Sequence, residues 1–135
     1  MLTTALKTGL AALALVGLGA CSAYAQSIGE QEYVNNCASC HGEGGMGDGP
    51  LADLMTVPVP DLTVIAANND GVFPMLEMIQ VIDGRTGIRG HGYPMPVWGQ
   101  QFQADAADVA GPYGSELMVR GRVLELAEYL VSIQQ

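Results

Sequence analysis

The sequence predicts an all-α domain with long irregular loops. The chain has 135 residues, of which 49% are hydrophobic and 14% are charged, and this length suits one globular domain. No segment alternates apolar and polar residues strongly enough to be a strand. Three segments instead carry helical signals, and the stretches between them are rich in glycine and proline.

The first 25 residues are expected to be a signal peptide. Residues 10–20 form an apolar run after Lys7, which is about half of the roughly 20 residues that a membrane-spanning helix needs. Ala23-Tyr24-Ala25 then provides a small-residue cleavage site. We therefore expect residues 26–135 to form the domain, exported to the periplasm and without a transmembrane segment.

Cys21 offers a second way of processing the chain. Residues 18–21 loosely resemble a lipobox, and cleavage before Cys21 would leave a lipid anchor that tethers the domain to a membrane. Gly19, two positions before the cysteine, is a weak match to that pattern, so we favour the site that ends at Ala25.

The expected domain is strongly acidic. Residues 26–135 hold four arginines and no lysine against fourteen acidic residues, which gives a formal net charge of −10. Nucleic acid and anionic membrane surfaces require a basic footprint and are poor partners for such a chain. A protein partner with a basic docking patch is the better expectation.

Three helices are expected along the domain. The first begins at Ser27, where Glu30 stands at capping-box spacing, and runs to about the cysteines. The second opens at Pro74 as its first residue and stops at Gly84. The third and longest starts near Ser115, with an apolar stripe on one face. Its members are Val119, Val123, Leu126, Leu130 and Ile133. Residues 42–60 and 84–99 are expected to be irregular.

The segment Cys37-Ala38-Ser39-Cys40-His41 is the attachment signature of a c-type haem. Two thiols three positions apart can form thioethers to the two vinyl groups on one edge of the macrocycle. The histidine that follows is then held under the ring, where it supplies a nitrogen to the iron. Because a domain of this size with such long loops is short of core, a cofactor would also help to organise it.

A redox motif, a zinc site and a structural disulfide are the alternative chemistries for this motif. A thiol–disulfide redox motif normally follows a strand at the start of a helix, whereas here a helix precedes the motif and a glycine-rich loop follows it. Zinc bound by Cys37, Cys40, His41 and His91 would have suitable ligand types, but adjacent ligands do not match the usual paired spacing. A structural disulfide across two residues is the least favoured.

Met95 is the expected second axial ligand. It lies between Pro94 and Pro96, which stiffen the backbone and can hold a flexible thioether against a metal. The competing candidate is His91, which stands between two glycines as an exposed loop histidine would. The other methionines are expected to be packing or loop residues. They include Met75, Met78 and Met118 in helices, and Met46 and Met55 in the loop.

With these residues the chain resembles the class I cytochrome c family, particularly the small periplasmic monohaem proteins of bacteria. The matching segments are CASCHG (37–42), GDGPLA (47–52), PDLT (60–63), IDGR (82–85) and MPVWG (95–99). The resemblance implies a cytochrome c fold, in which N- and C-terminal helices pack crosswise beside a covalently bound haem. Tyr33 and Tyr129 would lie in that crossing, with Gly29 allowing close approach.

The same resemblance implies roles for individual residues. His41 is similar to the proximal ligand and Met95 to the distal one, and the carbonyl of Pro50 would accept a hydrogen bond from the His41 ring. Arg85 and Trp98 resemble groups that donate hydrogen bonds to haem propionates. For Arg85, a solvated surface position is an equal alternative.

The function that follows is that of a periplasmic electron carrier with one haem c and its iron, and not of an enzyme. The alternative is the haem-bearing, electron-accepting subunit of a periplasmic dehydrogenase or oxidase complex. A haem sensor or peroxidase, in which Met95 leaves the iron, is a third hypothesis. The lysine ring of the best-known family members is missing, so docking on acidic oxidase faces of the mitochondrial type is not expected.

Overall fold

The structure is a computed structural model that describes residues 26–87 and 95–135. The expected signal peptide, Cys21 and His91 therefore lie outside the described residues. Within the described ranges the secondary structure is entirely helical, which confirms the predicted all-α class. The α-helices are α1 (Ile28–Asn36), α2 (Ala38–His41), α3 (Met75–Asp83) and α4 (Trp98–Ser132). Short 3-10 turns occupy Ala52–Leu54, Leu62–Val64 and Ala67–Asn69.

The starts and stops of α1, α2 and α3 follow local rules. Ser27 caps α1 through its hydroxyl oxygen, which accepts a hydrogen bond from the Glu30 backbone N–H at 3.1 Å. Gly42 and Gly84 end α2 and α3 with positive φ values of 79° and 67°, which glycine adopts without strain. Pro74 stands at the N-cap of α3, one position before the place expected for it.

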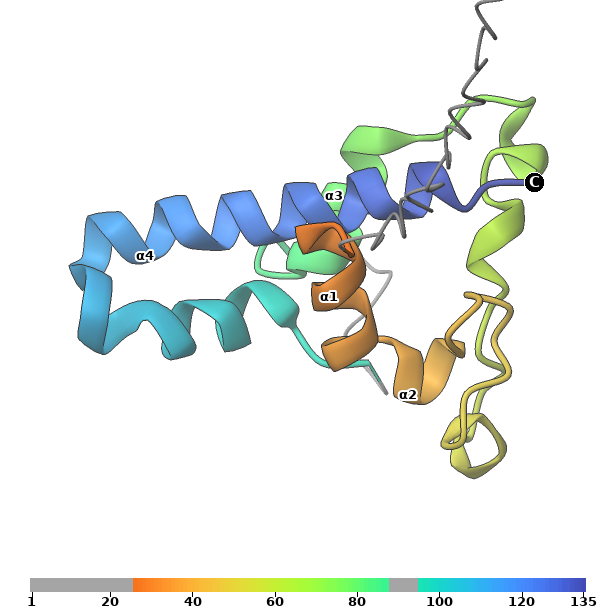
Figure 1. Cartoon of the computed structure of the whole chain (residues 1–135), viewed down its shortest axis with the longest axis horizontal. Coiled ribbons are helices and arrows are strands. Elements are labelled where there is room, and N and C mark those ends of the chain that lie inside the picture. Colours follow the sequence, from red (N-terminus) through yellow and green to blue (C-terminus); the bar gives the residue numbers. More distant parts are fainter. Residues whose placement is uncertain (1–25, 88–94) are drawn as a thin grey trace, which may run out of the picture.

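The helix α4 begins far earlier than its expected start near Ser115. Two arms, residues 98–110 and 112–132, meet at Gly111, whose φ of 64° and ψ of 178° are not helical. In Figure 1 the chain reverses its direction at this point, so the arms form a helical hairpin. The sequence did not predict the first arm as a helix. Its buried side chains are the large Phe102 and, one turn later, the small Ala106, and these two positions do not form a recognisable apolar stripe.

The core lies where α1 crosses the second arm of α4 (Figure 1). A Cβ atom on Gly29 would overlap the backbone carbonyl of Glu125, so only glycine permits this approach. The rings of Tyr33 and Tyr129 lie 5.0 Å apart, a distance at which tilted aromatic rings attract each other. The predicted crossing and the roles of these residues in it are confirmed. The expected stripe is also confirmed as core, with Val119, Val123, Leu126 and Leu130 buried.

Arg122 fastens α1 to both arms of the hairpin. Its guanidinium donates two hydrogen bonds of 2.9 Å to the Glu32 carboxylate and one of 3.1 Å to Asp105. The same group lies 3.7 Å from the centre of the Phe102 ring, in cation–π contact. Burial alone would lower the pKa of Arg122, but the two carboxylates outweigh it and raise that pKa. One side chain thus joins three helical segments.

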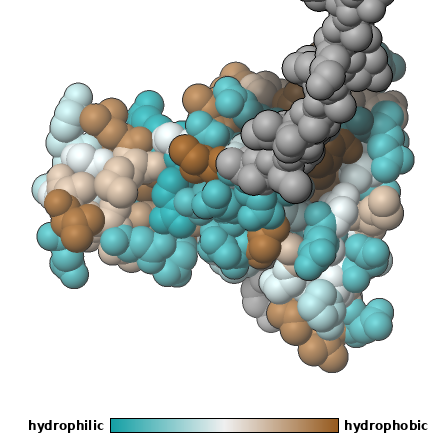
Figure 2. Space-filling view, viewed as in Figure 1, coloured by the Kyte–Doolittle hydropathy of each residue, from teal (hydrophilic) through white to brown (hydrophobic). Residues whose placement is uncertain are grey.

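None of the helices in the described part of the chain is both long enough and apolar enough to cross a membrane. On the face shown in Figure 2, hydrophilic side chains prevail over the middle of the molecule, and hydrophobic ones gather near the bend of α4 and near the loop that follows α2. Exposed apolar residues at these two places include Val109 and Tyr113 at the bend, and Leu51, Leu54 and Val57 in the loop.

Candidate functional site

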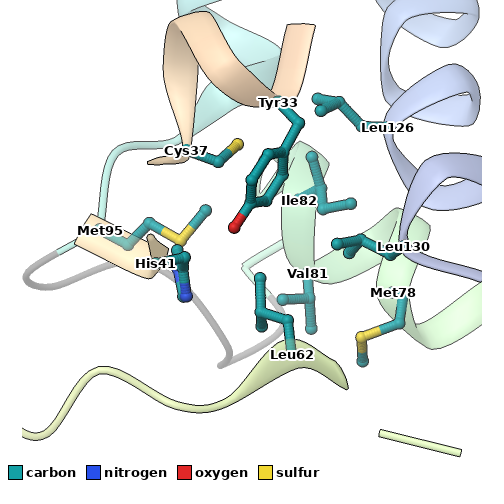
Figure 3. Close-up of a pocket in the computed structure, with 10 residues that line it drawn as sticks. All are labelled: Tyr33, Cys37, His41, Leu62, Met78, Val81, Ile82, Met95, Leu126 and Leu130. Atoms are coloured by element: carbon teal, nitrogen blue, oxygen red, sulfur yellow. The ribbon is translucent and has the colours of Figure 1, made fainter. Parts of the chain in front are cut away.

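A cavity of about 30 Å³, open in part to solvent, lies among α1, α2, α3 and the second arm of α4. Figure 3 shows the ten side chains that line it. Its apolar wall consists of Leu62, Val81, Ile82, Leu126 and Leu130. Cofactor and ligand sites are lined mostly by apolar side chains, and the lining of this cavity has the same character.

The predicted motif reaches this cavity through α1 and α2. Cys37 lies at the junction of the two helices and His41 at the end of α2, and both line the cavity and are buried. Cys40 is half-buried, and the two cysteines are not bonded to each other. Burial raises the pKa of the Cys37 thiol to about 12, with Glu32 adding to the effect, so this sulfur is protonated at neutral pH.

The ring of His41 is held by a backbone carbonyl. Its Nδ1 lies 3.3 Å from the carbonyl oxygen of Pro60, which can only accept, so Nδ1 carries the proton and Nε2 is the unprotonated nitrogen of the ring. Desolvation lowers the pKa of His41 and the Pro60 contact partly offsets this, so the ring is neutral at pH 7.

The prediction that the Pro50 carbonyl accepts the hydrogen bond from His41 was wrong. Pro50 is exposed, because the preceding Gly49 lies against α2 instead and donates its N–H to the Cys40 carbonyl at 3.1 Å. Gly47, with a φ of 80°, packs on the backbone of Val59, and this contact brings Pro60 to His41. Pro60 belongs to the segment 60–63 already singled out in the sequence, so a signal for it was present.

Met95, the expected second axial ligand, lines the same cavity as His41 (Figure 3). Its side chain is half-buried and comes from the chain just before α4. A second thioether, that of Met78 on α3, also lines the cavity. Sequence reasoning assigned Met78 to packing alone, because a helical apolar position does not reveal whether its neighbour is another side chain or a cavity.

Tyr33 contributes a polar group that sequence reasoning did not assign to the site. Its hydroxyl donates a 2.7 Å hydrogen bond to the carbonyl of Gly42, directly after His41, and its ring lines the cavity. Burial raises the pKa of this hydroxyl, with lesser contributions from Cys37, Tyr129 and Asp48, so it stays neutral. Tyr33 therefore joins the helix crossing to the end of the motif.

Trp98 has a buried donor without an acceptor. Its indole Nε1 has no hydrogen-bond partner among the described residues, although the atom is inaccessible to solvent. Its ring stacks at 5.6 Å on Phe102, which holds the indole in place. An unpaired buried N–H costs about 1–3 kcal/mol, so such a donor calls for an acceptor from a bound group. This observation supports the expected propionate contact of Trp98.

Arg85 is held in ion pairs and is not the solvated surface residue of one expectation. It does not line the cavity of His41 and Met95. Its Nε lies 2.6 Å from Asp83 Oδ1 and its Nη1 lies 2.7 Å from Glu116 Oε2, so the guanidinium is paired with two carboxylates. The same contacts lower the pKa values of both carboxyl groups, chiefly through hydrogen bonds from Arg85. The donors of Arg85 are engaged by Asp83 and by Glu116, which belongs to the helical hairpin. The sequence did not reveal this pairing, because the position of the hairpin could not be predicted.

Taken as donors, these residues fit a c-type haem. The site has two thiols that are not bonded to each other, a neutral imidazole held at Nδ1, a thioether, an apolar wall and a buried indole N–H that lacks an acceptor among the described residues. Soft thioether and imidazole ligands suit iron in an apolar pocket. A haem bound here would supply an iron that takes up and gives back one electron. Within the described residues, which leave out His91, no three His, Cys, Asp or Glu side chains gather as metal ligands.

Comparison with known proteins gives one family. The family model of cytochrome c oxidase, cbb3-type, subunit III, matches residues 25–111. This span contains the motif, the cavity segments of α1 to α3 and the first arm of α4, and it ends at the bend of the hairpin. Neither the curated proteins nor the solved structures include a match to the chain.

Proposed function

The chain belongs to the family of cytochrome c oxidase, cbb3-type, subunit III, a c-type cytochrome domain for haem-based electron transfer, and we propose that it is a periplasmic electron carrier. In this proposal one haem is attached through Cys37 and Cys40, and His41 and Met95 are the two axial ligands of its iron. The observation that supports this most directly is that Cys37, His41 and Met95 line one apolar cavity.

The residues around the cavity suit electron transfer rather than chemistry on a substrate. Its polar lining groups are the Cys37 thiol, the His41 ring and the Tyr33 hydroxyl, and each has a structural task. The apolar side chains of Leu62, Ile82 and Leu126 line the cavity and would exclude water from a haem bound there. An apolar, rigid surrounding keeps reorganisation small when the charge on the iron changes. No side chain in this lining is positioned to move a proton to or from a second molecule.

Axial ligation is tested by replacing Met95. We expect Met95→Ala to abolish the sulfur-to-iron charge-transfer band of the oxidised protein, and Met95→His to lower the reduction potential while the covalent haem stays attached, because imidazole donates more strongly than thioether. Visible spectra and potentiometry measure both. Met78→Ala is the matched control, since it removes the other thioether of the cavity and should keep the band. A band that persists in Met95→Ala but disappears in Met78→Ala would overturn the assignment.

A subunit role is the second candidate, because the matching family carries the name of an oxidase subunit. The two functions use the same residues and differ in the partner. After gentle extraction from its native host, a carrier should elute alone in size-exclusion chromatography. A subunit should instead co-purify with a catalytic protein in a constant ratio. Mass spectrometry of the purified mature chain also tests processing, with Gln26 expected as its first residue.

Partner choice is proposed to depend on the charge around the motif. Glu43, Asp48 and Asp53 are exposed on the loop that follows α2, beside the apolar Leu51 and Leu54. We expect reduction by a basic redox partner to slow about tenfold or more as salt rises from low to physiological strength, where the Debye length is about 8 Å. An acidic partner should show weak or inverse dependence. Flat stopped-flow rates with both would mean that apolar contact alone sets partner choice.

A further inference from the structure

The end of α3 and the hairpin α4 are joined by an ion-pair network of Asp83, Arg85 and Glu116. Arg85 donates from Nε and Nη2 to the two carboxylate oxygens of Asp83 at 2.6 and 2.8 Å, and from Nη1 to Glu116 at 2.7 Å. The side chains of Arg85 and Asp83 are only 24% and 18% exposed. Two-point contacts of this kind fix geometry as well as attract, particularly when they are shielded from water.

The first turn of α4 packs directly on this network. Gly99, the second residue of α4, is buried, and a Cβ atom there would overlap the Asp83 carboxylate and lie 2.7 Å from Arg85 Nε. Glycine at this position therefore lets the helix start touch the ion pair. A carboxylate beside the first turn of a helix is also favoured by the helix dipole. The network thus holds the start of α4 in a defined position against the end of α3.

Two residues of the proposed haem site come shortly before this held point in the sequence. Trp98, with its buried unpaired Nε1, immediately precedes Gly99, and Met95 lies four residues before it. A thioether side chain is flexible, so its position at the cavity depends on where its backbone is anchored. On the cavity side, Val81 and Ile82 belong to the last turn of α3, which ends at Asp83. The network therefore controls the spacing between this wall and Met95.

We propose that Asp83, Arg85 and Glu116 are positioning residues that hold Met95 and Trp98 at the haem. This rests on the proposed ligation by Met95. The network itself makes no contact with the cavity, so its effect reaches the iron through Gly99 and the start of α4. Weakening it should let Met95 leave the iron more often while the haem stays covalently attached and the helices stay folded.

The test uses exogenous imidazole as a competitor for the Met95 position in the oxidised holoprotein. We expect Arg85→Gln and Glu116→Gln to raise the apparent affinity for imidazole about tenfold, because that affinity scales with the fraction of molecules whose sixth position is open. The charge-transfer band should weaken in parallel. Arg120→Gln is the matched control. Arg120 also pairs with Glu116, at 2.8 Å, but is 73% exposed, and the atoms that a Cβ on Gly99 would meet belong to Asp83 and Arg85, so the removal of Arg120 should leave imidazole binding unchanged.

A second variant separates positioning from a general loss of stability. Arg122→Gln weakens the fold at the α1 crossing and should lower the melting temperature without changing imidazole affinity. If Arg85→Gln fails to fold, Arg85→Lys keeps the charge but not the two-point contact and should show the same rise in affinity. Wild-type imidazole affinity in a folded Arg85 variant would overturn the proposal. Retention of the band in Met95→Ala would instead overturn the proposed ligation, so the two failures are distinguishable.

Discussion

The helix crossing and the loop after α2 are built in different ways. In the crossing, large side chains fill the space, with Tyr33, Phe102, Val119 and Leu126 almost wholly buried. Across residues 42–70, by contrast, the only buried positions are three glycines and Thr63. The helical part of the molecule therefore has a hydrophobic core of its own, whereas the loop part has almost none.

The loop is held mainly through its backbone. The N–H groups of Gly47, Gly49 and Leu51 donate to carbonyls of α2, at 2.8 to 3.1 Å. These hydrogen bonds place the loop beside the cavity but bury little apolar surface, which is the main source of folding free energy. The loop therefore needs something in the cavity to pack on, while the crossing defines where that cavity lies.

The largest effect is expected from removing the haem attachment. Cys37→Ala with Cys40→Ala should give a largely unfolded chain, because the loop part loses its packing partner and the apolar wall of the cavity is left facing water. Far-UV circular dichroism measures this. Native-like helix content in the haem-free double variant would contradict this prediction and would show that the crossing is stable without the haem.

A smaller effect is expected at Gly29 in the crossing. Gly29→Ala should destabilise the holoprotein by about 3 kcal/mol, because its Cβ would overlap the Glu125 carbonyl and press on Tyr129. Gly121→Ala is the matched control, since a Cβ there meets nothing within 4 Å and should stabilise α4 by about 1 kcal/mol. Urea unfolding measures both, and equal midpoints for the two variants would contradict the close approach.

The smallest effect is expected at Arg122, which fastens the crossing from its rim. Arg122→Gln should cost about 2 kcal/mol, because the partly buried Glu32 carboxylate loses two charged hydrogen bonds but keeps the one from Asn36. Arg120→Gln should cost under about 0.5 kcal/mol because its ion pair is exposed. Thermal unfolding compares them. The visible spectrum of both should stay native, since neither residue lines the cavity.

Features with a local cause were predictable from the sequence. The Ser27 cap and the glycine that ends α3 follow from the preferences of single residues within one helical turn. The attachment motif needs five consecutive residues, and the expected meeting of Gly29, Tyr33 and Tyr129 came from the family resemblance. The all-α class and the apolar stripe of the last helix follow from helical periodicity, which is also a local pattern, and the structure confirms both.

Features that depend on where distant segments meet were not predictable. The first arm of α4 is helical because Phe102 and Arg122 pack it on the second arm, a contact between residues twenty positions apart. Pro60 rather than Pro50 holds His41 because the loop folds back at Gly47. Arg85 pairs with Glu116, thirty-one residues away, which no spacing rule anticipates.

The sequence by itself determined the chemistry of this protein, namely which side chains can bind a haem and an iron, and which short segments are helical. Only the tertiary structure decided which carbonyl orients His41, which carboxylates bind the Arg85 guanidinium and where α4 begins. The physical reason is range. Capping, turn formation and ligand identity depend on neighbours along the chain, whereas ion pairs and close backbone approach depend on packing across it.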